Sequence, residues 1–276
     1  MIKKSYLYQF FLTIMTFTVC SESYSAFLAR SPYNAYASQA ASIRFNRVNM
    51  QIPANIGEPK GRGAGGRRGC NANDADDQLI PLVPITETSD RSIRWGLTTS
   101  AHPTLWVYSP KGFQNGALIW LSVLDQTNTM LYRIPFQIPK TSSGVLQFAV
   151  PSKVASLQPN TPYRWQLTIY CNSGGDNLNN LTFDTPFIIT GGVQRIVLSA
   201  DSQQQLAIAK TSLGKAIVYA KNGIWYDSLT TLGNSIRDST APNNDMLRAW
   251  MELLQQSNLE KPASSTLVKC CTPKEN

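Results

Sequence analysis

Hydrophobic and polar residues alternate along the middle of the chain. The alternation is clearest over residues 163–171, where the odd positions are apolar or aromatic and Arg164, Gln166 and Thr168 are polar. Successive side chains of a strand point to opposite faces of a sheet. This period of two therefore predicts a strand with one buried face and one face in contact with water.

Eight runs between residues 79 and 198 share a strand-like composition. Each is rich in β-branched or aromatic residues and is bounded by Gly, Pro, Asn, Asp or Ser. Short strands at this spacing predict an immunoglobulin-like two-sheet β-sandwich over residues 79–198. The runs cover residues 79–83, 93–97, 104–108, 118–124, 130–138, 145–150, 163–171 and 187–198, the last with a break at Gly191 and Gly192.

The proline-containing segment 157–163 leads directly into the best strand. It resembles the tyrosine corner of immunoglobulin-like and fibronectin-type sandwiches, in which a tyrosine hydroxyl bonds back to the incoming loop. The alternative is a turn followed by an ordinary core tyrosine. We favour the corner, and we assign Tyr163 and Trp165 structural roles.

After Ala200 the period changes from that of a strand to that of a helix. Asp201 and Gln204 form a candidate capping box, and Asn222 with Gly223 supplies a stop. We expect a small C-terminal helical segment of two or three helices over residues 199–259, packed on the sandwich or appended to it. Its apolar stripes are Leu206, Ala209, Leu213, Ile217 and Ala220; then Trp225, Leu229, Leu232 and Ile236; and, from about Asn243, Leu247, Trp250, Met251 and Leu254.

The two ends of the chain lack the strand and helix patterns of its middle. Lys3 and Lys4 precede an apolar run and a small polar stretch, which is the pattern of a secretory signal peptide, and we place cleavage after Ser25. An uncleaved anchor is less favoured because the run is shorter than the roughly 20 apolar residues that cross a bilayer. A lipoprotein modified at Cys20 is a minor alternative. Residues 260–276 are polar and predict a flexible tail.

Composition adds a basic bias, with 25 Lys and Arg against 17 acidic residues and a net charge of +8. Part of it lies in a predicted flexible, Gly/Arg-rich leader over residues 26–78. Export makes nucleic acid an unlikely target, so the alternatives are an anionic envelope partner or a solvated leader with no partner. The glycine-rich segment 57–69 of this leader carries four basic residues, which are Lys60, Arg62, Arg67 and Arg68.

Cysteine usage fits an oxidising compartment. After removal of the signal peptide, Cys70, Cys171, Cys270 and Cys271 remain, and four thiols permit three pairings. We favour Cys70 with Cys171, because a bond between the neighbours Cys270 and Cys271 needs special geometry. The neighbours are then candidates for intermolecular bonding. No histidine accompanies these cysteines, so we predict no metal site.

The sequence offers little catalytic chemistry. His102 is the sole histidine, it precedes a predicted strand, and no Gly-x-Ser-x-Gly motif accompanies it, so a structural role is favoured. The glycine-rich segment lacks the ending of a phosphate-binding loop. The acidic residues 74–77 do not continue into a calcium-binding loop, and we read them as a solvated turn. We predict no cofactor and no catalytic residue.

Several segments together resemble one family: the Gly-rich basic leader, residues 79–84 and 96–108, the strand at 163–171, and residues 219–229 with Trp225, Tyr226 and Asp227. It is domain of unknown function 928, a largely cyanobacterial family of exported proteins, and the resemblance spans residues 57–260. The family implies an envelope location without an activity. We assign Trp225, Tyr226 and Asp227 structural roles.

These observations favour a non-enzymatic binding or interaction module in the periplasm or cell envelope, with an envelope protein or an anionic envelope polymer as partner. No second apolar span follows the signal peptide, so no transmembrane segment is expected after its removal. The alternatives are a hydrolase acting on an envelope polymer and a structural component that oligomerises through its helices.

Overall fold

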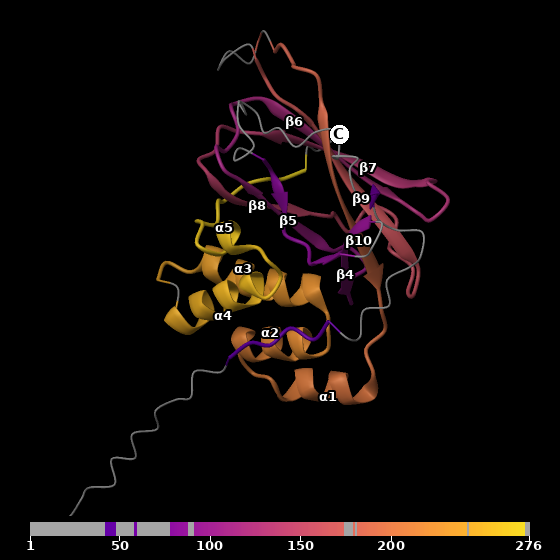
Figure 1. The fold of residues 1–276 in the computed structure, drawn as a ribbon, viewed down its shortest axis with the longest axis vertical. Coiled ribbons are helices and arrows are strands. Elements are labelled where there is room, and N and C mark those ends of the chain that lie inside the picture. The colour runs from indigo at the N-terminus through magenta and orange to yellow at the C-terminus, as the bar shows by residue number, and fades with distance from the viewer. Residues whose placement is uncertain are drawn as a thin grey trace, which may run out of the picture. The chain divides into compact units, whose positions relative to one another are not determined.

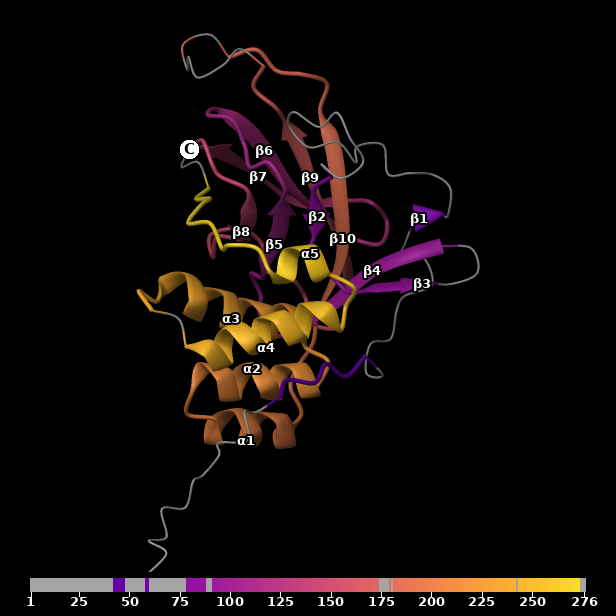
Figure 2. The ribbon, with the colours of Figure 1, turned by 60° about the vertical axis from the view of Figure 1, so that its left-hand side comes forward.

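A computed structural model describes residues 42–47, 58–59, 78–87, 91–173, 179, 181–241 and 243–273. These residues belong to one compact unit, Ala40–Asn276. The predicted signal peptide lies outside the described residues, as do Lys60, Arg62, Arg67, Arg68 and Cys70. Figures 1 and 2 show β-strands followed along the chain by helices.

The larger sheet contains most of the predicted strands. Its order is β1 (Glu58–Pro59), β4 (Arg91–Thr98), β10 (Phe187–Arg195), β9 (Pro162–Tyr170), β6 (Ala117–Leu124) and β7 (Met130–Ile138), and β3 (Ile85–Glu87) also pairs with β4. Strand β10 runs parallel to β4, whereas the pairs β10–β9, β9–β6 and β6–β7 are antiparallel. The parallel pair joins two segments that lie almost 100 residues apart in the sequence.

The smaller sheet has the order β2 (Ile80–Pro81), β5 (Thr104–Ser109) and β8 (Gly144–Ala149), with antiparallel pairing. Side chains of the two sheets meet in the core, where the rings of Phe136 on β7 and Phe148 on β8 lie 5.3 Å apart, edge to face. Every second residue of β6 and β7 is buried, as alternation requires. The prediction of a mainly β protein with two sheets is confirmed.

Five helices follow β10 within the described part of the chain, more than the predicted two or three: α1 (Ala200–Ile208), α2 (Ser212–Lys221), α3 (Trp225–Asp238), α4 (Asn244–Gln255) and α5 (Glu260–Ala263). The first expected helix is divided because Ala209 is extended and Thr211 caps a new helix, its Oγ1 accepting a hydrogen bond from Gly214 N. The expected capping box is also wrong, since Ser199 caps α1 by accepting from Ser202 N at 3.2 Å.

Helices α3 and α4 cover the outer face of the smaller sheet. Trp106 on β5 packs against the ring of Trp250 on α4 at 5.8 Å, and its indole Nε1 donates to Thr230 Oγ1 at 3.1 Å. Gly233 on α3 gives the Trp106 ring its space, because a Cβ there would lie 2.6 Å from the indole. The helices therefore pack on the smaller sheet at this point, and Figure 2 shows them below the strands.

Two segments predicted to be flexible form defined contacts with the fold. In the leader, Ile43 is 1% exposed, the Phe45 ring packs on Trp225 at 4.9 Å, and Glu58–Pro59 pairs with β4. In the tail, α5 is followed by a bridge from Leu267 to Val145 on β8, and Val268 N donates to Val145 O at 2.8 Å. Both predictions missed isolated apolar residues that lie in polar stretches yet reach the core.

The cysteine pairing also differs from the expectation in part. Cys270 and Cys271 form a disulfide with each other across a cis peptide bond, with their Cα atoms 3.3 Å apart. The bond is therefore intramolecular rather than intermolecular. Cys171 is disulfide-bonded as well, and its predicted partner Cys70 lies outside the described residues. Of the helices that the structure describes, none has the length and apolar character needed to cross a membrane.

Candidate functional site

The first turn of α3 joins the helices to both sheets through Trp225, Tyr226 and Asp227. Trp225 is fully buried, and its indole Nε1 donates to the carbonyl oxygen of Leu82 at 2.8 Å. Leu82 directly follows β2, so this bond fixes α3 to the edge of the smaller sheet. An indole buried in an apolar environment needs such a partner, because a lost hydrogen bond there has no compensation from water.

The hydroxyl of Tyr226 connects two strands of the larger sheet. It accepts from Trp165 Nε1 on β9 at 2.7 Å and donates to the carbonyl oxygen of Gly192 on β10 at 2.9 Å. Gly96 on β4 leaves room for the ring, since a Cβ at that position would lie 2.8 Å from Tyr226 Cε2. Burial raises the pKa of Tyr226 well above its usual range, so the hydroxyl remains protonated and able to donate.

Asp227 binds the end of β4. Thr98 Oγ1 donates to Oδ2 at 2.7 Å, Thr99 N donates to the same oxygen at 3.0 Å, and Thr99 Oγ1 donates to Oδ1. Burial raises the pKa of Asp227, and the hydrogen bonds from Thr99 and Thr98 oppose that rise. Both carboxylate oxygens are thus occupied by protein donors.

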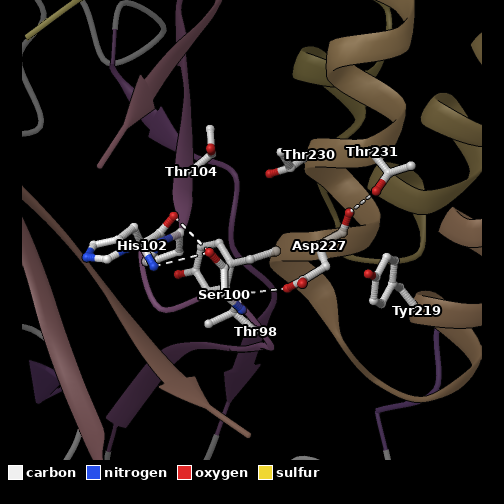
Figure 3. A pocket seen from close by; sticks show the side chains of 10 residues that line it. Thr98, Ser100, His102, Thr104, Tyr219, Asp227, Thr230 and Thr231 are labelled. Carbon is white, nitrogen blue, oxygen red and sulfur yellow. Dashed lines mark hydrogen bonds between the residues drawn. The ribbon is translucent and has the colours of Figure 1, made fainter. Parts of the chain in front are cut away.

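Figure 3 shows a pocket of about 140 Å³ beside Asp227, where β4, β5 and the helices α2 and α3 meet. Tyr219 lies next to the carboxylate, and its pKa is raised by burial and by the charge of Asp227, against a hydrogen bond with Thr99. The pocket is rich in hydroxyl groups, which come from Thr98, Ser100, Thr104, Tyr219, Thr230 and Thr231.

The geometry of Ser100 and His102 does not form a nucleophile–base pair. Ser100 Oγ donates to the carbonyl oxygen of His102 at 2.9 Å and accepts from His102 N at 3.1 Å, which are bonds within one turn. The imidazole points away from Asp227 in Figure 3, and its Nε2 lies 3.0 Å from the carbonyl oxygen of Val154. A serine triad needs the base on the nucleophile and the acid on the base, and these three side chains meet neither condition. The bonds that these side chains form are those of structural residues.

Of the other predicted residues that the structure describes, Tyr163, Trp165, Cys171, Cys270 and Cys271 do not line this pocket. The hydroxyl of Tyr163 accepts from Gln158 N at 3.2 Å, which is the bond back to the incoming loop expected of a tyrosine corner. In the part of the chain that the structure describes, no group of three or more His, Cys, Asp or Glu could hold a metal ion. Sequence reasoning missed Thr98 and Thr99 as partners of Asp227, because they lie 129 and 128 residues away and belong to an ordinary strand end.

We expect Asp227 to make stability depend on pH in an unusual direction. Its pKa is raised above the value of 3.8, so its contribution to folding is fully present below that pH and is lost as pH rises through the folded-state pKa. Asp227→Asn should therefore remove part of the loss of stability that occurs as pH rises above about 4, as measured by urea unfolding. Asp125, whose pKa is lowered mainly by a hydrogen bond from Thr127, is the matched control with the opposite sign. An unchanged pH profile for Asp227→Asn would contradict the assignment.

Trp225, Tyr226 and Asp227, which we call the clamp, fix the first turn of α3 to both sheets. The chain is therefore a two-sheet protein with a helical region attached to both sheets. Residues 63–267 match the family model described as Domain of Unknown Function (DUF928), and the chain belongs to that family. No curated protein matches the chain. Among solved structures, a β-glucuronidase of Parabacteroides merdae is similar at 11% identity, over 69% of this chain and 29% of that chain, with a TM-score of 0.25. A likeness this distant carries no argument about fold or activity.

Proposed function

We propose that this chain is an exported, non-enzymatic binding module of the cell envelope, built on an immunoglobulin-like sandwich. The strand order supports the sandwich type. Strands β2, β5 and β8 correspond to A, B and E of an immunoglobulin domain, and β6, β7, β9 and β10 correspond to C, C′, F and G. Tyr163 then lies at the start of strand F, where the tyrosine corner belongs.

The distribution of charge carries the proposal of binding. Residues 91–198, which form most of the two sheets, contain 8 basic residues and 3 acidic ones, whereas residues 199–259 contain 5 of each. The excess positive charge thus lies in the strand-containing region and the leader and is absent from residues 199–259. A field of one sign on one part of a protein attracts partners of the opposite sign, so an anionic envelope component is the expected partner.

A pull-down from envelope extract tests this function. The purified full chain should capture a specific envelope component, and capture should weaken as salt rises because exposed charges are screened. A variant with Arg62, Arg67 and Arg68 changed to alanine separates the leader from the folded region: loss of capture assigns binding to the leader, and retention assigns it to the sheets. If neither protein captures a specific component, the proposed function is wrong.

Export is tested separately by cell fractionation and N-terminal sequencing. Cleavage after Ser25 predicts a mature protein that begins at Ala26 and is found in the periplasm or envelope fraction. Recovery of the chain in the cytoplasm with Met1 still present would contradict export. This result does not depend on whether a partner is found.

A further inference from the structure

The outer faces of the two sheets differ in whether helices cover them. Helices α3 and α4 cover the outer face of the smaller sheet around Trp106. On the larger sheet, α3 packs on β4 and reaches β10 and β9 through Tyr226. In Figure 2 no described helix lies over the outward side of β9, β6 and β7. We call the outward side of β9, β6 and β7 the open face, defined by Trp120, Arg133, Gln137, Arg164, Gln166 and Tyr170.

The register places these side chains in rows across three strands. Arg133 on β7 is opposite Ser122 on β6, which is opposite Gln166 on β9. In the next row, Trp120 lies between Pro135 and Thr168. Strands are spaced by about 4.8 Å, so the outer positions of a row are roughly 10 Å apart. The face therefore extends over three strands, with polar groups repeated along it.

Two arginines give the open face its charge. The Arg133 guanidinium lies 4.3 Å from the centre of the Trp120 ring, and Arg164 Nη2 donates to Asn128 Oδ1 at 2.7 Å. Both side chains are exposed, and neither forms an ion pair with a carboxylate among the described residues. The indole and the amide hold the guanidinium groups in place, which reduces the entropy that a bound anion would have to overcome.

We propose that the open face binds an anionic polysaccharide that carries carboxylate groups. The planar fork of arginine matches a carboxylate with two parallel hydrogen bonds. The aromatic rings of Trp120 and Tyr170 offer apolar area with polar neighbours, and Gln137 and Gln166 supply donors and acceptors for hydroxyl groups. A protein partner is less favoured, because specific protein interfaces have a more apolar and desolvated centre than this polar face provides. The inference rests on the proposed function and names its ligand class and surface.

Binding to polygalacturonate by the purified full chain tests the inference, with neutral dextran and sulfated dextran as comparison polymers. We expect affinity for polygalacturonate, none for neutral dextran, and roughly tenfold weaker binding for Arg133→Ala and for Arg164→Ala, as loss of a charged hydrogen bond implies. Arg133→Lys should also weaken binding, since a lysine keeps the charge and loses the fork. Arg237→Ala is the matched control, because Arg237 pairs with Asp238 on α3, away from the open face.

Several outcomes would overturn the open face as the site. Equal loss of binding in the Arg237→Ala control, undiminished binding in the double variant of Arg133 and Arg164, or equal affinity for neutral dextran would each do so. Tighter binding to sulfated dextran would replace the carboxylate by a sulfate as the recognised group and would overturn the proposal as stated. Thermal melts of each variant show whether the fold is intact.

Failure of this inference differs from failure of the proposed function. If the pull-down captures an envelope component equally well with the double variant, the chain is a binding module that uses another surface. If the pull-down captures nothing and polygalacturonate does not bind, both proposals are wrong.

Discussion

Replacement of Trp106 by alanine should lower the free energy of unfolding by about 3–5 kcal/mol, as truncation of a large buried aromatic residue does. Trp106 is 1% exposed and lies between the smaller sheet and the helices. The change removes its packing against Trp250 and Gly233 and leaves Thr230 without its indole donor. A cavity should remain, because the groups around a truncated core residue relax only partially.

Urea unfolding followed by circular dichroism measures this effect. Phe183→Ala is the control, since Phe183 is 38% exposed and its truncation should cost well under half as much. A Trp106→Ala variant that loses less than about 1 kcal/mol would show that the helical layer does not depend on this contact. The helices would then be attached to the sandwich mainly by the first turn of α3.

The second large effect is expected for Tyr226→Phe, which deletes one oxygen atom from the core. The change leaves Trp165 Nε1 without its acceptor and Gly192 O without the Tyr226 hydroxyl. An orphaned buried polar group costs about 1–3 kcal/mol. We therefore expect destabilisation of that size even though the ring and its packing against Gly96 are preserved.

Tyr170→Phe provides the matched control. Tyr170 is partly exposed on the open face and its ring lies 6.2 Å from that of Phe183. Loss of its hydroxyl should change stability by no more than about 0.5 kcal/mol, as for most surface substitutions. The same unfolding measurement compares the pair. Equal effects of the two changes would contradict a special role for the Tyr226 hydroxyl.

Local alternation predicted the strands well because each sheet has one strongly buried side. The run 130–138, for example, becomes β7 with Tyr132, Ile134, Phe136 and Ile138 buried. The parallel pairing of β10 with β4 could not be predicted, because hydrogen bonding between distant backbones leaves no periodic signal in either strand. The divided first helix was missed for a different reason. Thr211 caps α2 within an otherwise continuous helical stripe. A threonine can lie inside a helix or cap a new one, so the sequence did not reveal the break.

Only some of the residues that form the clamp could be identified from the sequence. Trp225, Tyr226 and Asp227 form a distinctive triplet in the sequence, yet nothing nearby in the sequence identifies the groups to which they bind. Those partners are mostly backbone carbonyls and the hydroxyls of Thr98 and Thr99. Such groups occur in every strand, so their identity depends on the tertiary fold alone. For the open face, alternation predicted the exposed side of the strand at 163–171, but not its combination with β6 and β7, because strand order cannot be derived from local alternation.

The short segment at residues 42–47 affects how the protein should be produced. Asn46 N donates to Ala220 O at 3.0 Å, and Phe45 N donates to Gln256 Oε1 at 2.9 Å, so this piece of chain ties α2 to the end of α4. The family match begins 16 residues beyond it, at residue 63. A gene fragment cut at the family boundary would expose the Trp225 ring that Phe45 covers, and its product should aggregate or express poorly. Expression of this protein should therefore start upstream of Ser42.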